Sequence, residues 1–267
     1  MSDPQNFFQL NKQYWNAATH IHIASDFYET NQILEGKSSL TEIESTYLPD
    51  VSDKSILHLQ CHFGLDTISL ARKGAQCTGI DFSETAIQKA KELASKINVD
   101  IQFIESSVYD VPNLNLPPFD LVFTTYGTIG WLPDLEKWAQ VISGSLKPGG
   151  QLYFAEFHPF LYLYNFNTQQ LEYPYFNTGS PFIEDEGSTY ADRNTALDLQ
   201  SCFWQHSLDE IIGALISNGL EIKTFKEFDF SSYSCFPNMH VIGENRYRFG
   251  SDTLRFPHVF LIIAVKK

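Results

Sequence analysis

Ile56-Leu-His-Leu-Gln-Cys-His-Phe-Gly64 and Thr78-Gly-Ile-Asp-Phe-Ser83 are the two stretches that decide the predicted fold. The first begins with a short apolar run that predicts a buried strand, and Gly64 then begins a helical segment. Residues 76–80 predict a second strand, with Asp81 at its carboxyl end. This order places backbone N–H groups and a carboxylate at one edge of a parallel sheet, where nucleotide-like ligands bind.

The rest of the chain continues the alternation of strands and helices. Ser83 is a suitable N-cap for a helix to about Ile97, because its hydroxyl can accept an orphan backbone N–H. Later, Leu146-Lys-Pro-Gly-Gly150 predicts the end of a helix and a turn into a strand. Further strands are expected at 101–104, 119–126, 151–156, 220–228 and 259–265, with a helix between about 207 and 218 that starts at a capping box formed by Ser207 and Glu210.

Together these pieces resemble the class I S-adenosylmethionine-dependent methyltransferases. The resemblance rests on the loop at 56–64, on GIDFS at 79–83, on FDLVF at 119–123 and on LKPGG at 146–150. It departs from the family in the first loop, where family members usually carry an acidic residue at position 58 and glycines at 60 and 62. The resemblance implies an α/β fold with a Rossmann-like sheet in the order 3-2-1-4-5-7-6 and helices on both faces.

Four parts are expected along the chain. Residues 1–50 form an N-terminal helical lid, 51–157 the cofactor-binding half of the methyltransferase domain, and 206–267 its C-terminal half. Between the halves, residues 158–205 form an inserted β-rich arm with many aromatic side chains, and residues 229–256 are expected to be a loop. Two roles of the arm stay open: it either packs or dimerises, or it closes over a substrate pocket.

The resemblance implies S-adenosylmethionine as the cofactor and assigns its contacts. The turn cradles the methionine portion, Asp81 binds the ribose hydroxyls, and Phe82 covers the adenine face. Asp81 has a second interpretation as a carboxylate stabilised by the following helix N-terminus, and both can hold. The full set of expected cofactor residues is Gln60, Cys61, His62, Gly64, Asp81, Phe82, Ser107, Val108, Thr125 and Tyr126.

Three side chains are candidates for catalysis. Tyr126 follows a central strand at the edge where the transferred methyl group should lie. His158 and His206 could each act as a general base, because the histidine pKa suits proton removal near neutrality. His158 is preferred, since it follows a strand directly and Glu156 could orient its ring. A structural role is the alternative for each of the three.

A metal site is not expected. His58, Cys61 and His62 have a spacing close to that of some zinc sites, but one lies in a strand and two in a turn. The four cysteines form no CxxC pair, which is typical of a reduced intracellular protein.

Composition narrows the class of partner. The formal charge is −14 and no Lys/Arg cluster occurs, which disfavours nucleic acid and anionic membranes and favours a small-molecule methyl acceptor. Neither a signal peptide nor a membrane-spanning run is visible, so the cytoplasm is the expected location. Two other functions stay open. One is a non-catalytic module that binds S-adenosylmethionine or S-adenosylhomocysteine. The other is a nicotinamide-dependent oxidoreductase, although this sequence lacks the GxGxxG loop that such an enzyme needs.

Overall fold

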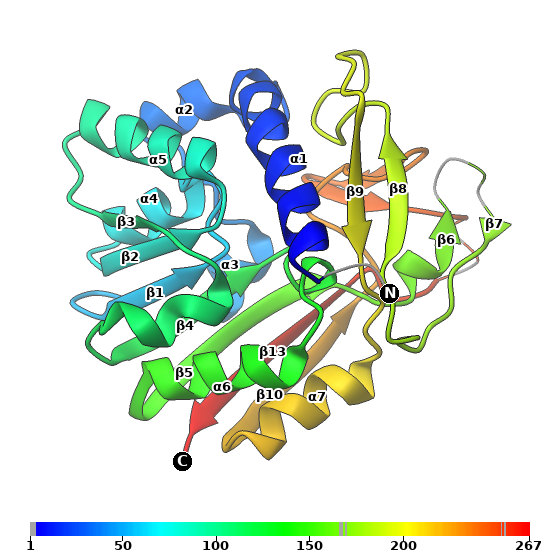
Figure 1. Ribbon diagram of the computed structural model, residues 1–267. Coiled ribbons are helices and arrows are strands. Elements are labelled where there is room, and N and C mark those ends of the chain that lie inside the picture. The colour runs from blue at the N-terminus through cyan, green and yellow to red at the C-terminus, as the bar shows by residue number, and fades with distance from the viewer. Residues whose placement is uncertain (1–3, 166–167, 169, 252, 254) are drawn as a thin grey trace.

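A seven-stranded sheet forms the centre of the molecule (Figure 1). The computed structural model describes residues 4–165, 168, 170–251, 253 and 255–267. The sheet order is β10-β13-β5-β4-β1-β2-β3, and only β13 runs antiparallel to its neighbours. This confirms the predicted order, read from the opposite edge. The strands are β1 (Ser55–Leu59), β2 (Gln76–Asp81), β3 (Gln102–Glu105), β4 (Phe119–Thr125), β5 (Leu146–Phe157), β10 (Leu220–Phe228) and β13 (Val259–Lys266).

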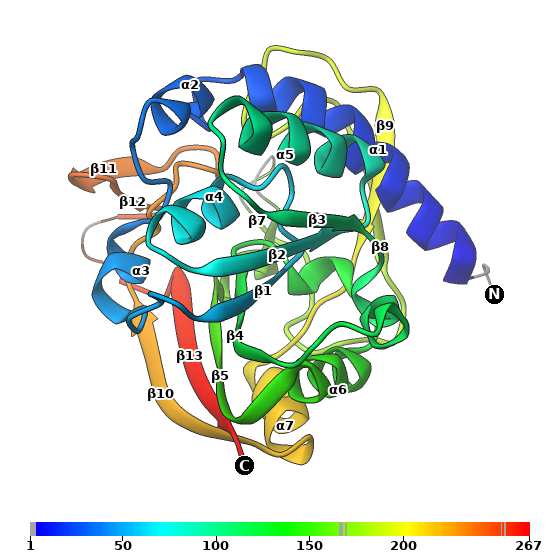
Figure 2. The ribbon, with the colours of Figure 1, turned by 90° about the vertical axis from the view of Figure 1, so that its left-hand side faces the viewer.

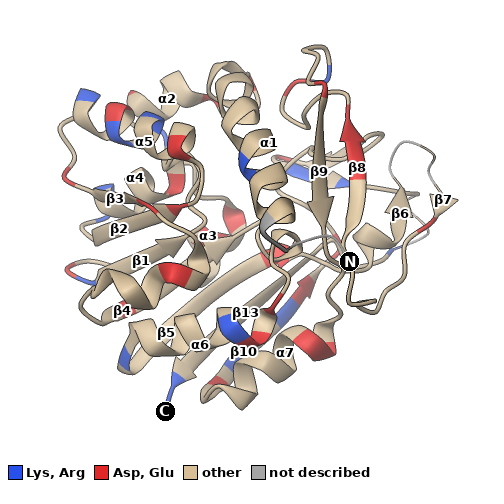
Figure 3. Ribbon diagram, viewed as in Figure 1, with Lys and Arg blue, Asp and Glu red and all other residues tan. Residues whose placement is uncertain are grey.

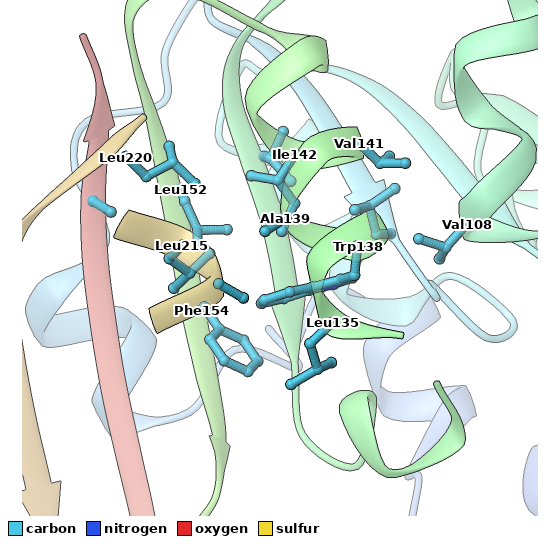
Figure 4. Packing of buried hydrophobic residues seen from close by; sticks show 14 of the residues in the cluster. Val108, Leu135, Trp138, Ala139, Val141, Ile142, Leu152, Phe154, Leu215 and Leu220 are labelled. Carbon is cyan, nitrogen blue, oxygen red and sulfur yellow. The ribbon is translucent and has the colours of Figure 1, made fainter. Parts of the chain in front are cut away.

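Helices cover both faces of the sheet (Figure 2). On one face lie α3 (Glu42–Tyr47), α4 (Leu65–Arg72) and α5 (Glu84–Lys96), and on the other lie α6 (Leu135–Ser145) and α7 (Leu208–Ser217). Alternate residues of one strand serve the two faces, since Ile56 packs with α3 and α4 while Leu57 packs with α6 and α7. Trp138 of α6 is fully buried, and its ring centroid lies 5.2 Å from that of Phe154. Figure 4 shows both side chains within this part of the core.

The helix starts follow the predicted capping chemistry in one case and depart from it in another. The Ser83 hydroxyl accepts the Ala86 N–H over 3.1 Å, as expected of an N-cap. The predicted capping box at Ser207 is wrong, because the side chain makes no capping bond and its hydroxyl donates to Asp209 over 2.5 Å. The hydroxyl is turned toward Asp209 two residues away, and its oxygen accepts no helix N–H.

The N-terminal region contains α1 (Pro4–Ala24) and α2 (Thr30–Leu34). Helix α1 lies between α5 and β9 (Leu199–Phe203), a strand of the arm (Figure 1). The side-chain amide of Asn11 makes two bonds to the backbone of Cys202, donating to its carbonyl over 2.9 Å and accepting its N–H over 2.8 Å. The Asn11 side chain therefore ties α1 to β9 through a pair of hydrogen bonds like those between neighbouring strands.

The segment between β5 and α7 is β-rich, as predicted, with two hairpins. These are β6 (Tyr164–Asn165) with β7 (Gln170–Leu171), and β8 (Phe182–Glu186) with β9. The prediction that 229–256 is only a loop is wrong, because it contains a third hairpin, β11 (His240–Gly243) with β12 (Arg246–Arg248). Short 3₁₀ turns are η1 (Val108–Leu114), η2 (Ile129–Trp131) and η3 (Leu161–Leu163). The four domain boundaries stay predictions.

The distribution of charged residues agrees with the acidic composition of the chain. Lys and Arg are scattered over the elements seen in Figure 3, whereas β8 carries several acidic residues in a row. None of the helices in the described ranges is long and apolar enough to cross a membrane.

Candidate active site

A large cleft of about 1380 Å³ opens at the carboxyl ends of the central strands. The loops after β1, β2 and β4 form its floor, and α1, the arm and the segment after β10 form its walls. Parallel α/β sheets bind their ligands at this edge. The site is built from segments far apart in the sequence.

The turn after β1 has the shape of a glycine loop without the glycines. Gln60, His62 and Gly64 have φ values of 55°, 51° and 79°, all in the left-handed region. The Gln60 side chain links this turn to the loop after β4, since its amide donates to the Thr128 carbonyl over 2.8 Å. Non-glycine residues in this region are strained by roughly 1–2 kcal/mol each, and such strain is concentrated at functional sites.

His62 also connects the turn to the lid. Its Nε2 lies 3.0 Å from Nδ1 of His22, which is fully buried in α1. The Trp15 ring lies 5.2 Å from that of His62. Burial lowers the pKa of His22 to about 3 and the pKa of His62 well below its usual range, so the pair is neutral at neutral pH.

Asp81 stands at the end of β2 and faces the cleft. Its carboxylate accepts the His62 N–H over 2.9 Å and the Ser83 N–H over 2.8 Å. Burial raises the pKa of Asp81 to about 6, although the two hydrogen bonds favour the ionised form and oppose this rise. Phe82 also lines the cleft, and its ring lies 5.3 Å from that of Phe8 in α1.

Several polar atoms around this floor are buried without a partner in the described part of the chain: Gln60 Oε1, Trp15 Nε1 and His22 Nε2. Buried polar groups are normally paired, so unpaired ones mark places where a ligand completes the bonding. Gln60 Oε1 can accept an N–H, for example from an ammonium group, and Asp81 can accept from adjacent hydroxyls. The residues present therefore fit a cofactor with an amino acid end and a ribose.

Not every predicted cofactor residue reaches the cleft. Gln60, Cys61, His62, Gly64, Asp81, Phe82, Thr125 and Tyr126 line it. Ser107 and Val108 do not: Ser107 accepts the Tyr109 N–H as the cap of η1, and Val108 is buried in the core. Tyr126 donates its hydroxyl proton to Glu44 over 2.8 Å, which holds the ring in the cleft wall.

The structure does not bring the two predicted histidine bases to the cleft. His158 Nδ1 accepts the Phe160 N–H over 3.1 Å, and its Nε2 lies 3.0 Å from Glu227 of β10. His206 lies between Glu210, 3.0 Å from its Nδ1, and the Leu132 carbonyl, 2.8 Å from its Nε2. Neither ring lines the cleft, so both placements correspond to the structural alternative.

Glu156 does not orient His158 either. Its buried carboxylate turns to the loop after β4 and accepts the N–H groups of Gly127, Thr128 and Phe157, as well as the Thr128 hydroxyl. The loop is thereby fixed beneath Trp131, whose indole N–H donates to the Gly127 carbonyl over 2.6 Å. Sequence analysis missed this role, because a carboxylate at a strand end gives no sign of which loop it binds.

The upper part of the cleft is aromatic. Phe27, Tyr28 and Tyr190 pack together, with ring centroids 5.1 and 5.3 Å from Phe27, and the hydroxyls of Tyr28 and Tyr190 are hydrogen-bonded. Tyr233 lies 5.1 Å from Tyr126. The arm supplies Tyr190 and the segment after β10 supplies Tyr233, so the arm does line the pocket. Sequence analysis also missed His22, although it lies seven residues after Trp15 on one face of α1.

Comparison with known proteins agrees with this geometry. Residues 57–152 match the family model described as a methyltransferase domain. Ubiquinone biosynthesis O-methyltransferases of Serratia proteamaculans and Alkalilimnicola ehrlichii are 30% and 31% identical over 105 and 108 residues. These matches cover 39% and 40% of this chain and 43% of each relative, so the similarity spans less than half the length of either relative.

Solved structures are similar over most of the chain. An S-adenosylmethionine-dependent methyltransferase from Clostridium acetobutylicum has a TM-score of 0.58 at 16% identity, covering 94% of this chain and 98% of that protein. Another from Mesorhizobium loti has a TM-score of 0.55 at 18% identity, covering 87% of this chain and all of that protein. The fold of the chain is therefore that of the S-adenosylmethionine-dependent methyltransferases of known structure. Within it, residues 57–152 match the methyltransferase domain that the family model describes.

Proposed function

We propose that this protein binds S-adenosylmethionine and transfers its methyl group to a small molecule. The observation that carries the proposal is Asp81, a buried cleft carboxylate fixed by the backbone of His62 beside a left-handed turn. The cofactor supplies an electrophilic methyl group on a sulfonium. The protein's part is to bind and align the two partners, which can account for most of the rate in a displacement of this kind.

Different residues are proposed to bind the cofactor, to position the loops and to shape the cleft. Asp81 accepts hydrogen bonds from the ribose hydroxyls, and Gln60 Oε1 accepts one from the ammonium group. Glu156 keeps the loop after β4 in position, and α1 excludes water from the turn through His22 and Trp15. Tyr126 stays bonded to Glu44 and shapes the wall between the cofactor and acceptor parts of the cleft.

The acceptor is proposed to be a planar molecule that carries a hydroxyl group. Aromatic walls from Phe27, Tyr28 and Tyr190 support a planar or apolar acceptor, and they also suit a cationic sulfonium. The name of the two curated relatives refers to O-methylation in ubiquinone biosynthesis, which supports oxygen as the acceptor atom. The cytoplasmic location, the absence of nucleic acid and membrane partners, and a homodimer contact through the arm stay predictions.

Calorimetry with S-adenosylhomocysteine and NAD, side by side, tests the proposal against its alternatives. Binding of S-adenosylhomocysteine alone is expected. Binding of NAD alone would favour the oxidoreductase. Mass spectrometry of small phenols incubated with S-adenosylmethionine then separates an enzyme from a non-catalytic module, because only an enzyme adds the mass of a methyl group.

A further inference from the structure

Asp66 is a carboxylate in the cleft that the proposed binding roles leave unused. It belongs to the first turn of α4, two residues after Gly64, and lines the cleft. Ser39 donates to its Oδ1 over 2.5 Å, and Thr125 at the end of β4 donates to its Oδ2 over a longer 3.4 Å. Within the described part of the chain it forms no ion pair, so hydroxyls alone compensate its charge.

The surroundings of Asp66 favour proton uptake. Burial raises the pKa of Asp66, and the bonds from Ser39 and Thr125 oppose that rise. Burial raises the pKa of the Tyr233 phenol most, and the negative charge of Asp66 raises it further. The charge of Asp66 also helps to raise the pKa of Tyr28, again after burial. Glu44 of α3 faces it as well, and its own pKa is raised by burial and by the charge of Asp66. The neighbours are therefore acids and phenols, with no cation among them to hold Asp66 ionised.

We propose, resting on the methyl transfer proposed above, that Asp66 is the general base that accepts the proton lost by the acceptor hydroxyl. The acceptor O–H bond breaks and its proton moves to an Asp66 oxygen. The oxygen's electron pair forms the bond to the methyl carbon, and the carbon–sulfur pair stays on sulfur. Charge balances, because the positive charge lost at sulfur equals the negative charge neutralised on Asp66.

The geometry favours Asp66 over the other cleft carboxylates. Asp81 is committed to backbone N–H groups and to the ribose end. Glu186, whose pKa burial also raises, accepts the Ser201 hydroxyl over 2.6 Å within the β8–β9 hairpin. Asp66 alone among the three accepts a hydrogen bond from Thr125 at the end of β4, and its charge acts on Tyr28 of the aromatic wall. A carboxylate there, with a raised pKa, is suited to remove a proton near neutrality.

The test compares two acceptors of one shape, catechol and 4-nitrocatechol, because the nitro compound is already ionised near neutral pH and needs no base. Asp66→Asn is expected to lower kcat for catechol by about 10²–10⁴-fold and kcat for 4-nitrocatechol by less than about 10-fold. Asp100→Asn, which removes a charge at an exposed position outside the cleft, should leave both rates unchanged. Equal loss with both acceptors, loss in Glu186→Gln instead, or no methylation of either acceptor by the parent protein overturns the assignment.

A second readout does not depend on turnover. In protein loaded with S-adenosylhomocysteine, a ¹³C carboxyl resonance absent from Asp66→Asn should titrate above the usual aspartate range; a resonance that titrates within that range overturns the assignment. Calorimetry on the same samples distinguishes the two proposals. Failure of S-adenosylhomocysteine to bind the parent protein contradicts the proposed function itself, whereas intact binding with unaltered catechol kinetics in Asp66→Asn contradicts only the role of Asp66.

Discussion

The carboxylate of Asp81 accepts the backbone N–H of His62 over 2.9 Å, so the loops after β1 and β2 are joined. The ribose of the proposed cofactor would thus meet a carboxylate whose orientation is fixed by the protein's own backbone. Preorganisation of this kind lowers the cost of ordering side chains on binding.

Asp81→Asn should weaken S-adenosylhomocysteine binding by about 10–100-fold, because one charge-assisted bond to the ribose, worth roughly 1.5–3 kcal/mol, is lost. Asn keeps the shape and one acceptor oxygen, so the fold should survive. Calorimetry measures the affinity and thermal melting checks the fold. Asp100→Asn, an exposed aspartate, is the matched control. Unchanged affinity in folded Asp81→Asn would remove Asp81 from the site.

Cofactor affinity should depend on pH through the same carboxylate. Burial raises the pKa of Asp81 from its ordinary 3.8 to about 6, and only the ionised form accepts from both ribose hydroxyls. Affinity should therefore fall as pH drops below about 6. Stability of the apo protein should change in the opposite sense, since a raised folded-state pKa favours the fold at low pH and this contribution is lost as pH rises to about 6. Calorimetry across this range should show the slope in the parent protein and a flatter one in Asp81→Asn.

His62→Gly should loosen the lid without disturbing the turn. Glycine tolerates the φ of 51° found there, while the bond to His22 disappears. Hydrogen exchange should accelerate in the second half of α1 and stay unchanged in β4. His22→Ala should give the same acceleration, and the double variant should add little to either. Additive effects would show that the two rings act independently.

Glu156→Gln should destabilise the protein by about 2–4 kcal/mol, because an NH₂ group would replace an oxygen that faces backbone N–H donors. Urea unfolding measures the loss. Glu35→Gln, exposed on the surface, should stay within about 0.5 kcal/mol of the parent. A stable Glu156→Gln would mean that the loop after β4 is held by other contacts.

Asn11→Ala should release the arm from α1. Two hydrogen bonds to Cys202 are lost, at about 1 kcal/mol each, and the β8–β9 hairpin loses its neighbour along the edge. Limited proteolysis should then cut within the arm sooner than in the parent. Asn6→Ala, on the same helix, should be cut at the parent rate.

Local signals predicted most of the fold. The positions of the strands and helices follow from apolar runs, from Ser83 as a cap and from Asp81 at the end of β2, all of which act within a few residues. The order of the strands in the sheet came from the resemblance to the methyltransferase family, because local signals do not determine which strands pair. The capping box predicted at Ser207 is wrong, although the sequence fits one, because the hydroxyl is oriented toward Asp209 and makes no capping bond. The hairpin at 240–248 was not predicted, because its strands are short and their apolar and polar residues do not alternate clearly.

The site was predictable only where its residues directly follow strands. Gln60, His62 and Asp81 were expected at the same edge of the sheet for that reason, and all three line the cleft; their contacts to the cofactor stay predictions. His158 was misjudged because its partner, Glu227, lies in a strand far along the chain. Asp66, the proposed base, gave no signal in the sequence, since LDTISLAR reads as an ordinary helix and Ser39, which donates to Asp66, comes from another segment. Long-range partners decide these roles, and a single sequence does not contain them.

The attachment of α1 at two points has a mechanical consequence. The helix is tied to the arm at Asn11 and to the turn after β1 at His22, and Tyr14 and Trp15 between these points line the cleft. A displacement of the helix would strain both attachments at once, so the arm and the turn are expected to move together.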